Sequence, residues 1–79
     1  MSFRRKRRSK YEIALAILKQ CPALKTQIMY GANLSFAQLN HYLSLLEEKK
    51  LITKEGKSFV ITKKGKECRE ILEQIQNFL

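Results

Sequence analysis

The sequence of 79 residues contains no Asp and no Trp, and it contains a single His. All seven carboxylates are Glu, and no acid and base stand together in a pattern typical of catalysis. The three Gly residues are too scattered to form a loop that binds phosphate groups. We therefore expect a protein that is not an enzyme and that has no cofactor.

Cysteine and long apolar runs are also scarce. Cys21, Cys68 and His41 are candidate zinc ligands, but they lack the short paired spacing of structural zinc sites, so we expect no metal. No apolar run approaches the roughly 20 residues that a membrane helix needs, and no apolar signal region follows the basic N-terminus. The sequence therefore predicts a soluble intracellular protein.

The length allows one small domain. Hydrophobic residues make up 44% of the chain and charged residues 29%, which is typical of a folded globular protein. A chain of this size buries only about 60 to 65% of the surface that it exposes when unfolded, so a second subunit would add stability.

The formal net charge of +9 is concentrated at the N-terminus. Six basic residues precede the first acid, and these are Arg4, Arg5, Lys6, Arg7, Arg8 and Lys10. Because these charges repel one another, we expect residues 1–8 to form a flexible basic arm. Three roles fit such an arm: contact with nucleic-acid phosphates or a minor groove, contact with a membrane surface, or a solvated tail. Of these three roles we favour contact with nucleic acid.

Two helices are expected before residue 32. Ser9 and Glu12 have capping-box spacing and predict a helix over 10–20, which ends before Pro22 because the residue before proline avoids helical geometry. A second short helix is expected over 23–30, with Leu24, Ile28 and Met29 toward the core. Gly31 is expected to close it in a left-handed turn.

The most regular helix is expected to begin after Ser35, which has capping-box spacing with Gln38. Its apolar residues recur at helical spacing and predict a face that packs inward, and these are Phe36, Leu39, Leu43 and Leu46. The opposite face is centred on Ala37, His41, Ser44 and Glu48, with Gln38 and Asn40 beside it.

Small and amide-bearing side chains near the start of a helix suit the reading of base edges. Asn or Gln can bond adenine through two atoms, and an apolar group can meet the thymine methyl. Ser35 and the first amides of the helix could hold a phosphate. The alternative is an ordinary polar surface, and for His41 the alternatives also include a pH sensor or a metal ligand. For Tyr30 and Tyr42 we favour packing of the ring on the core.

Two short β-favouring runs, 51–53 and 58–62, follow this helix. Gly56 lies between them where a hairpin needs a positive φ, so a two-stranded wing is expected. Lys54 and Lys57 at its tip are candidate phosphate contacts, although lysines at a turn are often only solvated.

Thr62 is expected to cap a last helix over 63–77. Its apolar stripe is wider than one small domain easily covers, and its residues are Cys68, Ile71, Leu72, Ile75, Phe78 and Leu79. We predict that residues 63–79 form a dimerisation helix whose stripe pairs with a second copy. The alternative is that the whole stripe folds back onto its own domain.

The expected elements run α-α-α-β-β-α, so the predicted fold is mainly α with a small β-hairpin wing. A helix-turn-helix followed by a wing places one helix in a DNA groove. We therefore predict a winged helix-turn-helix domain over residues 9–62.

Several residues in this order resemble a known family. They are Ile28-Met29-Tyr30, Asn33-Leu34-Ser35-Phe36, Gln38-Leu39, Tyr42-Leu43, Leu46, Leu51-Ile52, Ile61-Thr62 and Lys64-Gly65-Lys66. Together they resemble small archaeal winged-helix DNA-binding proteins, which include crenarchaeal chromatin-like proteins and regulators of archaeal viruses and plasmids. The resemblance implies a homodimer formed through the last helix. It also implies a duplex-DNA face at or near Ser35, Phe36, Gln38, Asn40, His41, Tyr42, Lys54 and Lys57.

The sequence departs from the family at three places. Gln27 stands where a basic residue is expected, and Asn40 and His41 stand where the third helix usually presents lysines. Lys50 replaces a common glycine, which predicts a strained left-handed residue at a cost of about 1 kcal/mol. The resemblance also makes a disulfide involving Cys21 or Cys68 conceivable, because intracellular proteins of hyperthermophilic archaea are disulfide-rich.

The leading hypothesis is a homodimeric transcriptional regulator that prefers certain duplex sequences and acts in the cytoplasm, near the nucleoid or in the host of a virus. Its two reading helices would lie about 34 Å apart in successive major grooves. One alternative is an architectural protein that coats DNA with little sequence preference. The other is a winged-helix module that binds protein, with an arm that only aids localisation; an RNA target is less favoured because no stacking platform of aromatic residues is evident.

Overall fold

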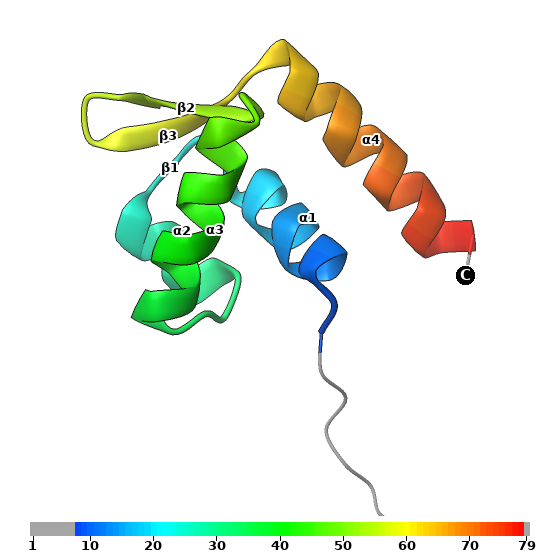
Figure 1. Cartoon of the computed structure of the whole chain (residues 1–79), viewed down its shortest axis with the longest axis horizontal. Helices are drawn as coiled ribbons and strands as arrows, with labels where there is room; N and C mark the ends of the chain where they lie inside the picture. Colours follow the sequence, from blue (N-terminus) through cyan, green and yellow to red (C-terminus); the bar gives the residue numbers. More distant parts are fainter. Residues whose placement is uncertain (1–7, 79) are drawn as a thin grey trace, which may run out of the picture.

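The computed structural model describes residues 8–78 (Figure 1). Its elements follow the order α1 (Lys10–Gln20), β1 (Ala23–Leu24), α2 (Lys25–Gly31), α3 (Phe36–Glu48), β2 (Ile52–Glu55), β3 (Ser58–Ile61) and α4 (Lys63–Phe78). The predicted fold class is confirmed, with one additional strand. No helix among residues 8–78 is long and apolar enough to cross a membrane.

The sheet has three antiparallel strands in the order β1-β3-β2. The sequence predicted only the β2–β3 wing and placed Ala23 and Leu24 in a helix, which is wrong. These two residues follow Pro22 in extended geometry and pair with Phe59 and Ser58, so their backbone groups bond to β3 instead of to a helix. Leu24 is consequently 41% exposed and does not face the core.

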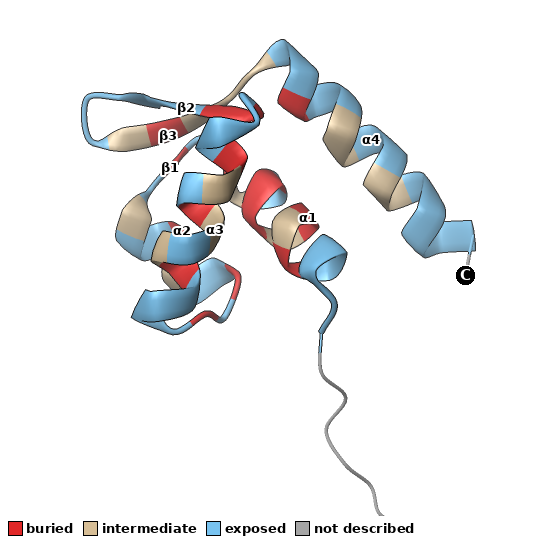
Figure 2. Ribbon diagram, viewed as in Figure 1, coloured by how far each residue is buried: buried red, intermediate tan, exposed pale blue. Residues whose placement is uncertain are grey.

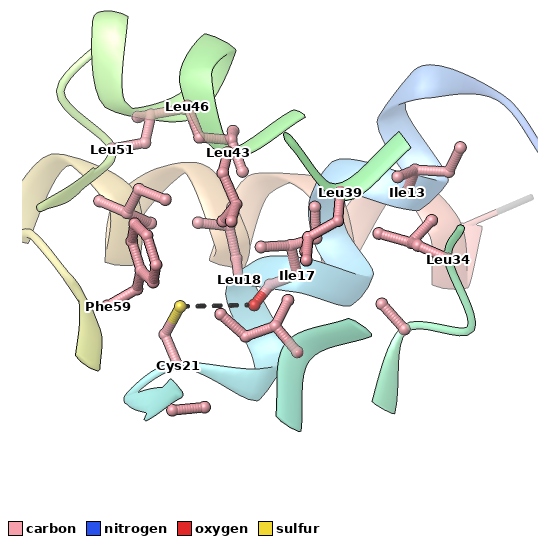
Figure 3. Close-up of a cluster of buried hydrophobic side chains, with 14 residues drawn as sticks. Ile13, Ile17, Leu18, Cys21, Leu34, Leu39, Leu43, Leu46, Leu51 and Phe59 are labelled. Atoms are coloured by element: carbon pink, nitrogen blue, oxygen red, sulfur yellow. Dashed lines mark hydrogen bonds between the residues drawn. The ribbon is translucent and has the colours of Figure 1, made fainter. Parts of the chain in front are cut away.

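The core lies between α1, α2, α3 and the sheet (Figure 2). Its most completely buried side chains are Ile17, Leu18, Ile28, Leu39 and Ile52. Figure 3 shows Leu39 and Leu43 of α3 directed toward Ile17 and Leu18 of α1, and Leu46 beside Leu51 in the same cluster. Three of the four apolar positions predicted on α3 therefore hold this helix on the core.

The fourth position, Phe36, is 63% exposed, so its predicted inward orientation is wrong. Leu34, just before the N-cap Ser35, takes its place and is buried in the same cluster as Leu39. This pairing across the start of the helix is a hydrophobic staple, and it satisfies the core without the aromatic ring.

The turn between α2 and α3 also differs from expectation. Asn33, not Gly31, adopts the left-handed conformation, with φ 56°. The Asn33 amide donates to the Tyr30 carbonyl at 3.3 Å, and the Leu34 amide donates to the Met29 carbonyl at 2.9 Å. These two bonds form a Schellman motif that ends α2 and directs Leu34 into the core.

The same motif ends α3. Lys50 has φ 63°, as predicted, and its amide donates to the Glu47 carbonyl at 2.9 Å. The Leu51 amide donates to the Leu46 carbonyl at 2.9 Å, and both leucine side chains are buried. The chain therefore reverses into β2 at a lysine in a backbone conformation that favours glycine.

Thr62 joins the end of α3 to the start of α4. Its hydroxyl lies 2.8 Å from the Lys50 carbonyl oxygen and 3.0 Å from that of Leu51, and it accepts a bond from the Gly65 amide at 2.9 Å. A methyl group at Gly65 would overlap the Leu51 carbonyl oxygen. The predicted cap is confirmed, and the small residue at 65 permits the close approach of the two backbones.

The apolar stripe of α4 is divided between two environments. Cys68 and Leu72 are half-buried against the core, and α4 packs along α1 with an ion pair between Lys19 and Glu73 at 3.8 Å. Ile71, Ile75 and Phe78 are 56%, 52% and 89% exposed. The alternative that the whole stripe folds back is therefore wrong for the described part of the helix. Leu79 lies outside the described residues.

We predict that Lys50→Gly stabilises the fold by about 0.5 to 1 kcal/mol, because glycine adopts a positive φ without steric cost. Chemical denaturation followed by circular dichroism measures this change. Lys49→Gly is the matched control, because Lys49 has φ −85° and gains no relief. An equal effect of the two substitutions would contradict the assignment of strain to residue 50.

Candidate nucleic-acid interface

The start of α3 is held by a reciprocal pair of hydrogen bonds. The backbone N–H of Gln38 donates to Ser35 Oγ at 3.1 Å, and the backbone N–H of Ser35 donates to Gln38 Oε1 at 3.0 Å. The side-chain oxygen of Gln38 is thus engaged by the helix itself. Its NH₂ group and the hydroxyl hydrogen of Ser35 remain able to donate to a ligand.

The outer face of α3 is polar and small. Ala37, His41 and Ser44 are exposed, whereas Asn40 is half-buried. The Tyr42 ring is half-buried and meets the His41 ring edge to face, with centroids 5.0 Å apart. His41 is therefore presented to solvent beside an aromatic ring that the core partly holds.

A cation and an aromatic ring meet where α2 and α3 begin. Lys25 Nζ lies 5.0 Å from the centroid of the exposed Phe36 ring. The contact is of cation–π type and joins the first residue of one helix to the first residue of the next. Lys25 was not among the predicted site residues, because only the tertiary contact shows that it lies beside the start of α3.

The wing tip projects from the sheet, away from α4 (Figure 1). Gly56 has φ 62° at its turn, as predicted. Lys54 and Lys57 are exposed on either side of it, and Lys54 Nζ lies 5.8 Å from the Phe59 ring. The described residues do not bring these lysines into contact with the first turn of α3.

The base of the basic arm is attached to the helix-turn-helix. Arg8 Nη2 donates to the Asn33 carbonyl at 2.9 Å, and Asn33 is two residues before the N-cap of α3. Arg4, Arg5, Lys6 and Arg7 lie outside the described residues. The DNA contacts predicted for these four residues would therefore start from Arg8, which lies beside the start of α3.

Tyr30 is a further exposed group that the sequence interpretation placed wrongly. It was expected to pack on the core, but its side chain is 78% exposed on α2. Ile28 alone is fully buried in this short helix, which leaves the Tyr30 side turned outward. Tyr42 keeps the expected partial packing.

Neither thiol is in a disulfide: Cys21 is buried and Cys68 is half-buried, and both are free. Cys21 Sγ donates to the Ile17 carbonyl at 3.5 Å (Figure 3), and burial raises the pKa of its thiol. Among residues 8–78 no group of three His, Cys or Glu side chains is placed to hold a metal ion.

A profile of the winged helix-turn-helix family matches residues 7–79. The chain belongs to the winged helix-turn-helix family. Within this fold α2 and α3 are the helix-turn-helix and β2 and β3 are the wing, while β1 adds a third strand.

Two proteins of an archaeon are similar to this chain in sequence. An uncharacterized protein of Methanocaldococcus jannaschii is 33% identical over 75 residues, which cover 91% of this chain and 77% of that protein. An uncharacterized HTH-type transcriptional regulator of the same organism is 38% identical over 50 residues, or 63% of this chain and 47% of the regulator.

A solved structure is also similar. Sso10a-2, a DNA-binding protein from Sulfolobus solfataricus, aligns with a TM-score of 0.81 and 30% identity, over 90% of this chain and 81% of that chain. The expected resemblance of this winged helix-turn-helix chain to small archaeal DNA-binding proteins is confirmed.

Proposed function

We propose that this protein binds double-stranded DNA as a homodimeric transcriptional regulator with a sequence preference. The observation that carries the proposal is the composition of α3, which has no carboxylate between its N-cap and Glu47 while its inner face is fixed by Leu39, Leu43 and Leu46. The outer face of α3 carries no carboxylate before Glu48, near its C-terminal end, so its N-terminal turns can enter a major groove without repelling phosphates. The DNA-binding protein and the HTH-type regulator among its relatives support this function.

In this proposal residues 1–8 are the arm, 9–62 the DNA-binding domain and 63–79 the dimerisation helix. Ser35 and the amides at the start of α3 hold a phosphate, and Phe36, Gln38, Asn40, His41 and Tyr42 lie at or near the bases. The wing residues Lys54 and Lys57 contact the backbone beside the groove. The arm adds phosphate or minor-groove contacts, because Arg8 starts it next to α3.

An architectural protein with little sequence preference is the second candidate. The engaged side-chain oxygen of Gln38 favours it, because bonding adenine through two atoms would require that oxygen as well as the NH₂ group. Ala37 and Ser44 offer little sequence discrimination. A gel shift with one duplex selected from a random library, competed by unselected duplex, distinguishes the two. A regulator prefers the selected duplex about a thousandfold, and an architectural protein does not.

Absence of duplex binding near physiological ionic strength would contradict both candidates. It would instead favour the protein-interaction module that shares this fold.

We predict that replacing Arg4, Arg5, Lys6, Arg7 and Arg8 with Gln flattens the dependence of log K on log salt by about 0.9 for each phosphate that the arm no longer neutralises. Titrations at several salt concentrations measure the slope. An unchanged slope would remove the arm from the DNA interface and leave it as a solvated tail.

Dimerisation is proposed from the exposed apolar surface of α4. Ile71, Ile75 and Phe78 leave more than half of their side chains exposed, and Tyr11 of α1 is 61% exposed. Tyr11, Leu15, Leu72 and Ile75 line a groove between α1 and α4. In this proposal a second copy covers this surface together with Cys68 and Leu79. An interchain disulfide involving Cys21 or Cys68 stays a prediction.

We predict that Ile75→Glu converts a dimer to a monomer, because a carboxylate in an apolar interface loses its hydration. Sedimentation equilibrium measures the mass. Gln74→Glu is the matched control, because it adds the same charge one residue away, where the exposed wild-type side chain is already polar. Equal masses for the two variants would place the dimer contact elsewhere.

We also predict opposite effects of Gln38→Glu on stability and on DNA affinity. Glutamate keeps the cap and suits the positive end of the helix dipole, so stability rises by about 0.3 to 1 kcal/mol. The same charge faces DNA phosphates and lowers affinity by about tenfold or more. Thermal denaturation and gel shifts measure the two effects.

Gln27→Glu provides the control, because Gln27 Oε1 accepts a hydrogen bond from the backbone N–H of Leu24 at the start of α2 in the same way. It should stabilise the fold while lowering affinity less. An equal decrease of affinity in both variants would show that α3 is not the helix closest to DNA.

A further inference from the structure

We propose that Phe36 and Lys25 form a thymine-reading subsite, in which the ring contacts the C5 methyl group of a thymine and the ammonium contacts the adjacent phosphate. This inference rests on the proposed DNA-binding function and names the chemistry of one contact within it.

The position of Phe36 is the first argument. It is the first residue of α3 after the N-cap, and in a helix-turn-helix the N-terminal residues of the second helix reach the base edges. The thymine methyl is the apolar group in the major groove, and phenylalanine is one of the side chains that can contact it.

The exposure of the ring is the second argument. Leu34 and Leu39 already close the core at this end of α3, so folding does not require Phe36. A ring with 63% of its surface in water gains free energy when an apolar ligand covers it. The contact with Lys25 holds the ring at the start of the helix, where a base edge would arrive.

The lack of another side chain that could contact a methyl group is the third argument. The side-chain oxygen of Gln38 is bonded to the Ser35 amide, and Asn40 is half-buried. The NH₂ group of Gln38 and the hydroxyl of Ser35 can still donate hydrogen bonds, but a methyl group needs an apolar partner, and the exposed apolar side chains at the start of α3 are Phe36 and Ala37. Both are apolar, and among the groups of the major groove apolar side chains fit the thymine methyl.

The charge of Lys25 is the fourth argument. Among residues 8–78 the single ion pair joins Lys19 and Glu73, so no carboxylate neutralises Lys25 in the described part of the chain. Its ammonium lies 5.0 Å from the ring centroid that would face the base. A phosphate of the same nucleotide or its neighbour is the anion available at that distance from a base edge.

The test replaces each thymine of a bound duplex in turn with deoxyuridine, which differs only by the missing methyl group. For the wild-type protein we expect one or two replacements to lower affinity by about fourfold, the effect of removing one methyl group from an apolar interface. For Phe36→Ala we expect weaker binding and no difference between thymine and deoxyuridine at those positions.

Tyr30→Ala is the matched control, because it removes another exposed aromatic ring, from α2. It should leave the thymine preference unchanged. Since both side chains are exposed, the variants should keep the wild-type circular dichroism spectrum. Lys25→Gln should lower the salt slope by about 0.9 and keep the thymine preference, whereas Lys19→Gln should leave both unchanged.

The outcomes separate this inference from the proposed function. A wild-type protein that binds the duplex but shows no effect of any replacement overturns the thymine subsite and leaves DNA binding standing. A thymine preference that persists in Phe36→Ala also overturns it, because another residue then reads the methyl group. A wild-type protein that binds no duplex overturns both.

Discussion

The close approach of Leu51 and Gly65 determines how the parts of this molecule are arranged. Thr62 bonds to the carbonyl oxygens of Lys50 and Leu51, and the missing side chain of Gly65 lets the first turn of α4 lie on that backbone. One junction therefore sets the directions of α3, of the wing and of α4 together. In a dimer formed through α4, this junction would also set the distance between the two reading helices, because no flexible linker separates them.

The basic charge is distributed around α3 and not on it. The described outer face of α3 offers hydroxyl, imidazole, amide and aromatic groups, while Arg8, Lys25, Lys54 and Lys57 come from other elements. In the proposed complex the side chains at the bases come from α3, whereas the positive charges that attract phosphates come from other segments. Substitutions on α3 would then alter sequence preference with little change in the electrostatic attraction to DNA, so specificity would be separable from affinity.

Elements determined by local chemistry were predictable from the sequence. The capping boxes at Ser9 and Ser35 and the Gly56 turn depend on neighbouring residues, and each was placed correctly. The left-handed Lys50 was expected from the family resemblance, and this too is confirmed. Two exceptions depend on partners distant in sequence: Ala23 extends because β3 offers it hydrogen bonds, and Lys25 joins the candidate site only through a tertiary contact. Two others are local choices between neighbouring residues: Asn33 takes the left-handed turn instead of Gly31, and Phe36 faces outward because Leu34 fills the core.

The short strand β1 has a consequence for the synthesis of the protein. Ala23 and Leu24 find their partners, Phe59 and Ser58, near the far end of the domain, and Phe59 itself closes the core. A nascent chain that has released α1, α2 and α3 still lacks the strand against which its first half is completed. Completion of the sheet and core on the ribosome therefore waits until β3 has left the exit tunnel, because β1 has no strand partner before then.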